Sequence, residues 1–232
     1  MRHAMRIVSV GALALVIMLA GRPAAAETIV TFVTNLGAFD VQLFDTQAPT
    51  TAANFLSYVN AGSYTNTFFH RSTTYDSAEV QIVQGGGFGY APPNFFAVGT
   101  MPPIPLEAGL LNLRGTIAMA RTNDPNSATS QWFFNVTDNP ALDPAPGNDG
   151  YAVFGQVVGN GMQVIDAIAG LNVYNGNPPI IGQQTGPFGE LPLINGDTLV
   201  MVESVVAIPE PTTLALALSA LVGIATLRRR SL

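Results

Sequence analysis

The stretch Gln131-Trp132-Phe133-Phe134-Asn135-Val136 is a short run rich in aromatic residues, which favour β-strands. Similar runs occur along the chain at Thr67–His70, Val80–Val83, Gly115–Met119, Tyr151–Val158 and Leu199–Val206. Thr28–Thr34 and Ala38–Phe44 alternate on either side of a short turn, Asn35-Leu36-Gly37, which predicts a β-hairpin. The sequence therefore predicts a mainly β protein with many short strands.

Two segments have a helical period instead. Asp45–Gly62 contains Pro49 near its start and an apolar face, and Met162–Leu171 places apolar residues at helical spacing before a glycine. Asn172–Gly196 is rich in Gly, Pro and Asn, which predicts a long surface loop. We expect an antiparallel β-barrel or sandwich capped by two α-helices.

The charge of the chain is distributed unevenly. The 232 residues have a formal net charge of −6, and all nine basic residues are arginines. Residues 27–207 contain three of these arginines and fourteen acidic residues, which gives this body a formal charge of −11. Nucleic acids and anionic lipids attract basic patches, so an acidic body disfavours both as partners.

Missing residue types exclude several kinds of chemistry. The chain has no lysine and no cysteine, and His70 is the single histidine of the body. Schiff-base and P-loop lysine chemistry, disulfides, thiol nucleophiles and His-rich metal sites are therefore excluded. The glycine run Gly85–Gly89 lacks the following Lys-Ser/Thr of a phosphate loop, so it predicts a close backbone approach instead.

The N-terminal segment 1–26 has the pattern of a secretory signal. It has a basic start, an apolar run Ile7–Ala20 and small residues at Ala24 and Ala26, so we place the mature start near Glu27. An uncleaved membrane anchor is the alternative, although about 14 apolar residues would span only about 21 Å as a helix.

The C-terminal segment 208–232 combines three features. Pro209-Glu210-Pro211 is followed by the uncharged run Thr212–Leu227 and by three arginines. This order resembles the PEP-CTERM sorting signal of bacteria, which implies a membrane helix and cleavage by an exosortase-type enzyme. The alternative is a plain C-terminal anchor. The protein is expected to be exported, to the periplasm or outer cell surface, and anchored in the inner membrane at least transiently.

Five motifs stand in order in the body: Phe68-Phe69-His70-Arg71, Val83-Gln84-Gly85-Gly86-Gly87, Arg114–Arg121, Ser130–Phe134 and Tyr151–Val158. Together they resemble the cyclophilin family of peptidyl-prolyl cis-trans isomerases, of the bacterial type, over roughly Ile29–Leu171. The resemblance implies a closed, eight-stranded barrel with two capping helices in residues 27–207. It also implies proline-containing peptides or proteins as partners, and no cofactor.

The residues fit this chemistry. An Xaa–Pro bond rotates over a barrier near 18–20 kcal/mol because the amide has partial double-bond character. Rotation leaves a lone pair on the prolyl nitrogen, and a fixed hydrogen-bond donor aimed at that nitrogen favours the twisted state. Neither a nucleophile nor a general base is needed.

The resemblance assigns roles to nine residues. Arg71 is the catalytic donor, and Gln84 braces it and binds the substrate backbone. The apolar slot for proline comes from Ile82, Phe133 and Leu142, while Ala120, Arg121, Gln131 and Tyr151 bind the residues around it. The structural alternatives are carbonyl binding at a strand end for Arg71, a solvent-facing side chain for Gln84, and core packing for Ile82, Phe133 and Leu142. His70 is assigned a structural role.

Two residues depart from the family pattern. Gln81 stands where the family usually has an aromatic of the proline pocket, and Ala141 replaces a large groove residue. The sequence thus leaves two main functions open: an isomerase that assists the folding of exported or envelope proteins, or a catalytically weak proline-peptide-binding module at the cell surface or in the exopolysaccharide matrix. A carbohydrate-binding barrel is a third, disfavoured because Trp132 is the only tryptophan and lies in a predicted core strand.

Overall fold

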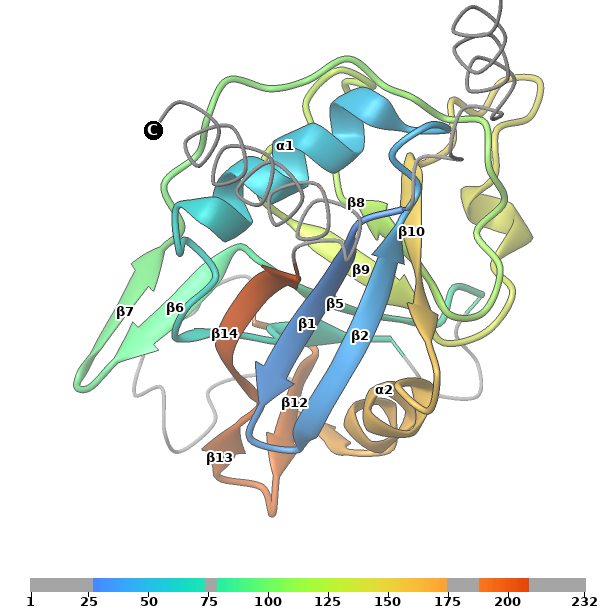
Figure 1. Cartoon of the computed structure of the whole chain (residues 1–232). Coiled ribbons are helices and arrows are strands. Elements are labelled where there is room, and N and C mark those ends of the chain that lie inside the picture. The colour runs from blue at the N-terminus through green and yellow to red at the C-terminus, as the bar shows by residue number, and fades with distance from the viewer. Residues whose placement is uncertain (1–26, 74–78, 175–187, 209–232) are drawn as a thin grey trace, which may run out of the picture.

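A computed structural model describes residues 27–73, 79–174 and 188–208 of the chain (Figure 1). The predicted signal peptide at 1–26 and the predicted sorting tail from residue 209 onward lie outside the described residues. Within the three described ranges, no helix is long and apolar enough to cross a membrane.

The described residues form one large antiparallel sheet and a small accessory sheet. The large sheet contains β1 (Ile29–Thr34), β2 (Gly37–Leu43), β3 (Thr67–Phe68), β4 (Arg71–Ser72), β5 (Ile82–Gly85), β6 (Phe88–Ala91), β7 (Asn94–Ala97), β8 (Thr116–Met119), β9 (Trp132–Asn135), β10 (Val153–Val158) and β14 (Met201–Ile208). Their order is β4-β5-β9-β8-β10-β2-β1-β14-β3-β6-β7. The accessory sheet has the order β11-β12-β13, with β11 (Asn172–Tyr174), β12 (Leu191–Ile194) and β13 (Thr198–Leu199).

The two predicted helices are present. Helix α1 (Pro49–Asn60) begins at the proline, where a missing backbone N–H costs nothing. The Glu107 carboxylate accepts hydrogen bonds from the backbone N–H groups of Thr50 and Thr51 at 3.1 and 2.7 Å, so a distant side chain caps this helix. Helix α2 (Met162–Ala169) buries Ile165 and Ile168. Figure 1 shows the two helices at opposite ends of the sheet.

The core lies inside the curved sheet and is rich in aromatic rings. Trp132 is fully buried and meets the rings of Phe32, Phe69 and Phe134 with centroid separations of 5.2, 5.3 and 5.4 Å. Edge-to-face contacts of this kind add to the free energy of burial. The prediction that Trp132 belongs to a core strand is confirmed.

Barrel closure and the count of eight strands are not confirmed. Among the described residues the strand pairings give a sheet with two ends, at β4 and β7. The segment Thr67–Ser72 nevertheless contacts both halves of the sheet. The Phe69 N–H donates to the Val200 carbonyl at 3.0 Å, and the His70 N–H donates to the Gln84 carbonyl at 3.0 Å.

The prediction that Asn172–Gly196 is a long surface loop is wrong for the residues of this segment that the structure describes. Asn172–Tyr174 and Leu191–Ile194 pair as antiparallel strands, and Leu193 pairs with Leu199. Leu191 and Leu193 are buried against Phe68 and Phe188, so this small sheet has an apolar core of its own. Tertiary burial therefore outweighs the local turn preference of the Gly, Pro and Asn residues. Strands β4, β6 and β7 were also not predicted.

Candidate active site

Strand alternation divides the aromatic strands between two faces. On β9, Trp132 and Phe134 point into the main core, while Phe133 belongs to a separate apolar cluster with Ile82, Ala118 and Val153. Successive side chains of a strand point to opposite faces of the sheet. Every second residue of these strands therefore faces the outer cluster instead of the main core. The outer cluster is the base of the candidate site.

The registers of five strands place key side chains in one row. Arg71 on β4 pairs with Gln84 on β5, and Gln84 pairs with Phe133 on β9. Phe133 in turn pairs with Ala118 on β8, which pairs with Val153 on β10. A charged donor, an amide and an aromatic ring thus lie side by side on the same face of the sheet.

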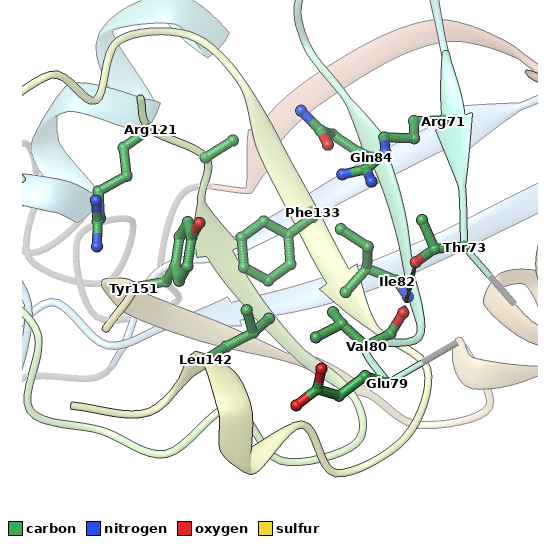
Figure 2. A pocket seen from close by; sticks show the side chains of 11 residues that line it. Arg71, Thr73, Glu79, Val80, Ile82, Gln84, Arg121, Phe133, Leu142 and Tyr151 are labelled. Atoms are coloured by element: carbon green, nitrogen blue, oxygen red, sulfur yellow. Dashed lines mark hydrogen bonds between the residues drawn. The ribbon is translucent and has the colours of Figure 1, made fainter. Parts of the chain in front are cut away.

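This row opens onto a cavity of about 400 Å³. Its lining residues are Arg71, Thr73, Glu79, Val80, Ile82, Gln84, Ala120, Arg121, Phe133, Leu142 and Tyr151. Figure 2 shows the Phe133 ring at the centre, with Arg71 and Gln84 on one side and Tyr151 and Leu142 on the other. The structure therefore brings together eight of the nine residues predicted for the site.

The floor of the cavity is apolar. Phe133 is 2% exposed and Ile82 is 5% exposed, so the two side chains form a packed surface. The Tyr151 ring stands edge-on to Phe133 with a centroid separation of 5.5 Å. Leu142 packs against the same cluster from the 3-10 helix Pro140–Leu142. A small, apolar ring such as that of proline fits a floor of this kind.

Arg71 is held by an ion pair. Its Nε donates to the Glu190 Oε2 at 2.6 Å, and the two side chains are 44% and 25% exposed. A guanidinium has five N–H donors and stays charged at all relevant pH values. The bond to Glu190 uses one of them.

Gln131, the ninth predicted residue, lies beside the cavity and contacts it through Gln84. The Gln84 Nε2 donates to the Gln131 Oε1 at 2.9 Å. Gln131 and Gln84 also line a second hollow of about 140 Å³, next to Ala120 and Arg121. The expected bracing of Arg71 by Gln84 therefore takes a different form: the two residues are paired through the backbone, while their side chains bond to Glu190 and Gln131.

The glycine run explains how Gln131 reaches this position. A Cβ atom at Gly87 would come within 2.8 Å of the Gln131 side chain, and one at Gly85 would come within 2.5 Å of the Trp132 ring. Real Cβ atoms essentially never make contacts this short. Glycine at Gly85 lets the Trp132 ring lie directly against the β5 backbone, and glycine at Gly87 leaves room for the Gln131 side chain, which an added Cβ would displace.

Arg121 is folded back onto the rim. Its Nε donates to the Gly150 carbonyl at 3.0 Å, and its guanidinium carbon lies 4.7 Å from the centre of the Tyr151 ring. The cation–π contact fixes the orientation of Tyr151. The third body arginine, Arg114, lies elsewhere and pairs with Asp166 at 2.7 Å.

His70 lies behind the site. It is 3% exposed and stands edge-on to Phe88 with a centroid separation of 5.1 Å. Burial, and secondly the positive charge of Arg71, lower the pKa of His70 to about 4, although contact with Gln131 acts in the opposite direction. The imidazole is neutral at neutral pH and adds no positive charge beside Arg71.

Three residues of the cavity lining were not predicted, and the two residues that depart from the family pattern do not line the cavity. Thr73, Glu79 and Val80 line the cavity, whereas Gln81 and Ala141 do not. The Gln81 backbone instead bonds to the Asn139 side chain at 2.9 and 3.0 Å, and Val80 supplies apolar surface to the floor. The apolar character of Val80, next to Gln81, was the available signal.

No metal centre accompanies this cavity in the part of the chain that the structure describes. There, no group of three or more His, Cys, Asp or Glu side chains is placed to hold an ion. Beside its apolar floor the cavity offers the Arg71 guanidinium and the Gln84 amide, and Thr73 and Glu79 also line it. Such an arrangement can bind a peptide and stabilise a developing lone pair, without bond cleavage.

Comparisons with known proteins agree with this geometry. The family model "Cyclophilin type peptidyl-prolyl cis-trans isomerase/CLD" matches residues 29–183. A peptidyl-prolyl cis-trans isomerase of Acinetobacter baylyi is 47% identical over 148 residues, covering 63% of this chain and 74% of the relative. Peptidyl-prolyl cis-trans isomerase B of Escherichia coli is 45% identical over 148 residues, covering 62% of this chain and 85% of the relative.

Solved structures show the same fold. The crystal structure of a cyclophilin-type isomerase of Cryptosporidium parvum aligns with a TM-score of 0.57 at 22% identity, covering 80% of this chain and 99% of that one. The chain belongs to the cyclophilin-type peptidyl-prolyl cis-trans isomerase family. It is an enzyme of that class, and cyclophilins bind proline-containing peptides.

Proposed function

We propose that the chain isomerises Xaa–Pro bonds of exported or envelope proteins and thereby assists their folding, with Arg71 as the catalytic donor. The observation that carries this proposal is the row of paired residues Arg71, Gln84 and Phe133, which sets a guanidinium beside an apolar floor. A dipeptide, Ala-Pro, was present with a Cryptosporidium parvum cyclophilin in one solved structure, which supports a proline-containing ligand for this cavity.

The proposed mechanism needs no covalent step. The proline ring binds against Phe133, Ile82 and Leu142, and this apolar contact holds one side of the rotating bond. As the amide twists, conjugation is lost and the prolyl nitrogen gains a lone pair. The Arg71 guanidinium donates a hydrogen bond to that lone pair, which is absent in both planar states. The interaction is therefore stronger in the transition state than in the substrate or product.

The two glutamines bind the peptide backbone in this proposal. Gln84 and Gln131 are already joined by one hydrogen bond, so their remaining donors and acceptors are oriented before substrate arrives. Arg121 acts through its backbone, because its guanidinium is engaged with Gly150 and Tyr151. The Tyr151 hydroxyl contacts a substrate carbonyl.

A protease-coupled assay on a short Xaa–Pro peptide tests the activity. The full chain should accelerate cis-to-trans conversion in proportion to its concentration, while an equal amount of heat-unfolded chain should not. Titration calorimetry with the same peptide gives the affinity separately. Binding without acceleration would contradict the isomerase proposal.

The second candidate, a catalytically weak binding module, is favoured by one feature. Gln81 and Ala141 take the places of large groove residues of the family, and neither lines the cavity. A groove with less apolar surface binds proline less tightly. Calorimetric affinity combined with a rate equal to that of the uncatalysed peptide would establish this function.

We also propose the cellular context of this activity. Segment 1–26 directs export, and segment 208–232 anchors the chain in the inner membrane until an exosortase-type enzyme cleaves it. The body then acts in the periplasm or at the outer surface. The basis is the order of residues in the two segments. Mass spectrometry of the protein from its native host is the test: a mature C-terminus that retains Arg228–Arg230 would contradict sorting. The closed, eight-stranded form of the barrel likewise remains a proposal.

A further inference from the structure

We propose that Glu190 is a positioning residue that sets the orientation of the Arg71 guanidinium for catalysis. This inference rests on the proposed function of Arg71. Glu190 lies outside the five sequence motifs and is 119 residues from Arg71 in the chain.

Glu190 contacts β4 twice. Its carboxylate accepts from the Arg71 Nε at 2.6 Å, and its carbonyl accepts from the Ser72 backbone N–H at 2.7 Å. The backbone bond fixes the distance between the two segments, and the side-chain bond fixes the direction of the guanidinium. A charge-assisted hydrogen bond of this length is stronger than a neutral one.

The accessory sheet holds Glu190 firmly. The residues around it in the chain, Phe188 and Leu191, are 6% and 0% exposed, and both pack against Phe68 on β3. Glu190 itself is only partly exposed, with 25% of its side-chain surface accessible. The carboxylate is therefore presented from a packed platform rather than from a free loop.

The ion pair with Glu190 restricts the orientation of the Arg71 side chain. The arginine side chain has many rotamers and is 44% exposed, so on its own it would sample orientations that point away from the cavity. Anchoring Nε restricts the guanidinium plane and leaves the two terminal amino groups for the substrate. A donor that is already oriented costs no reorganisation when the lone pair develops. Glu190 thus acts on the reaction through Arg71, without touching the peptide.

The test compares Glu190→Ala and Glu190→Gln with Glu203→Ala in the full chain. Glu203 lies on β14, is exposed, and provides a matched control away from the site. We expect Glu190→Ala to lower kcat about 10-fold with less than a 2-fold change in KM, since orientation and not ground-state binding is lost. Glu190→Gln keeps an acceptor for Nε–H and should stay within about 3-fold of the unmodified chain. Glu203→Ala should match the unmodified chain.

A double variant separates positioning from a structural effect. In an Arg71→Ala chain, Glu190→Ala should cause no further loss, because the group it orients is gone. An unchanged kcat for Glu190→Ala, or an equal loss in the Arg71→Ala background, would overturn the proposal.

A second readout works even if the chain proves to have no isomerase activity. In ¹⁵N NMR spectra, the Arg71 Nε–H signal, assigned by its loss in Arg71→Lys, should exchange slowly with water. It should shift and broaden in Glu190→Ala but persist in Glu190→Gln. A signal that Glu190→Ala leaves unchanged would overturn the positioning role, whereas absent acceleration with the predicted signal change would contradict only the proposed function.

Discussion

Gln84 and Gln131 share a hydrogen bond of 2.9 Å that joins β5 to the start of β9 at the edge of the cavity. Gly87 makes room for this pair. A Cβ atom at Gly87 would lie 2.8 Å from the Gln131 Cδ, so any larger residue there would collide with the Gln131 side chain. The glycine run therefore shapes the site through the side chain that it admits.

We expect Gly87→Ala to displace Gln131 and to lower kcat/KM about 5-fold, because the two amides lose their mutual orientation. Gly99→Ala is the matched control, since a Cβ there would meet nothing within 4 Å. Steady-state kinetics on one Xaa–Pro peptide measures both variants. Equal kcat/KM values for the two would show that Gln131 does not need its present position.

The alternation along β9 predicts different effects for two adjacent phenylalanines. Phe133 faces the cavity and Phe134 faces the main core. Phe133→Leu and Phe134→Leu should each lower the free energy of unfolding by about 1–3 kcal/mol. Only Phe133→Leu should raise KM, by about 5- to 10-fold, because it removes apolar surface that contacts proline. A similar rise in KM for Phe134→Leu would contradict the assignment of the two faces.

His70 should make stability depend on pH. Its pKa is about 4 in the folded chain and near 6.5 when unfolded, so the unfolded state takes up the proton first as pH falls. The contribution of the neutral imidazole is complete above pH 6.5 and is lost between about pH 6.5 and 4, by about 3 kcal/mol in total. Urea unfolding at pH 7 and pH 4.5 measures this loss.

The matched variant for this prediction is His70→Gln, which cannot titrate in that range. Carboxylates contribute equally to both chains, so the difference between their pH profiles isolates the histidine. Parallel profiles would mean that His70 has an ordinary pKa in the folded chain.

Glu107 should stabilise helix α1 without taking part in the site. Burial acts to raise the pKa of Glu107, but hydrogen bonds from the Thr51 hydroxyl and from the N–H groups of Thr50 and Thr51 hold it below its usual value. Glu107→Ala should cost about 1 kcal/mol of unfolding free energy, as the loss of a helix cap does, and leave kcat/KM unchanged. Thermal unfolding beside the activity assay would test this, and a large loss of activity would contradict it.

Much of the fold could be predicted because local sequence patterns signal many of its strands and both helices. The hairpin of β1 and β2, the strands around Trp132 and both helices follow from period and turn residues that lie close together in the chain. Strand β12 could not be predicted in this way. Leu191 and Leu193 are buried in a cluster with Phe68 and Phe188, which are distant or lie outside the strand, and no local pattern in a segment rich in Gly and Pro signals that burial.

The residues of the candidate site likewise fall into those that a local motif signals and those that only the tertiary fold brings into place. Arg71, Gln84 and Phe133 stand in motifs and could be predicted from the family resemblance, while the strand registers that place them in one row come from the structure. Glu190 has no such signal, since its contact with Arg71 arises from folding across 119 residues. Val80 lines the cavity and supplies apolar surface to its floor, whereas Gln81, whose backbone is bonded to the Asn139 side chain, does not line it.

The central claim is that Arg71 supplies the catalytic hydrogen bond. NMR exchange spectroscopy tests it most directly, because it measures the interconversion of the cis and trans forms of an Xaa–Pro peptide at equilibrium with small amounts of enzyme. We predict that Arg71→Ala lowers the enzyme-induced exchange rate about 100- to 1,000-fold, while Arg114→Ala, which removes an arginine outside the site, leaves it unchanged. Equal exchange rates for Arg71→Ala and the unmodified chain would contradict the claim.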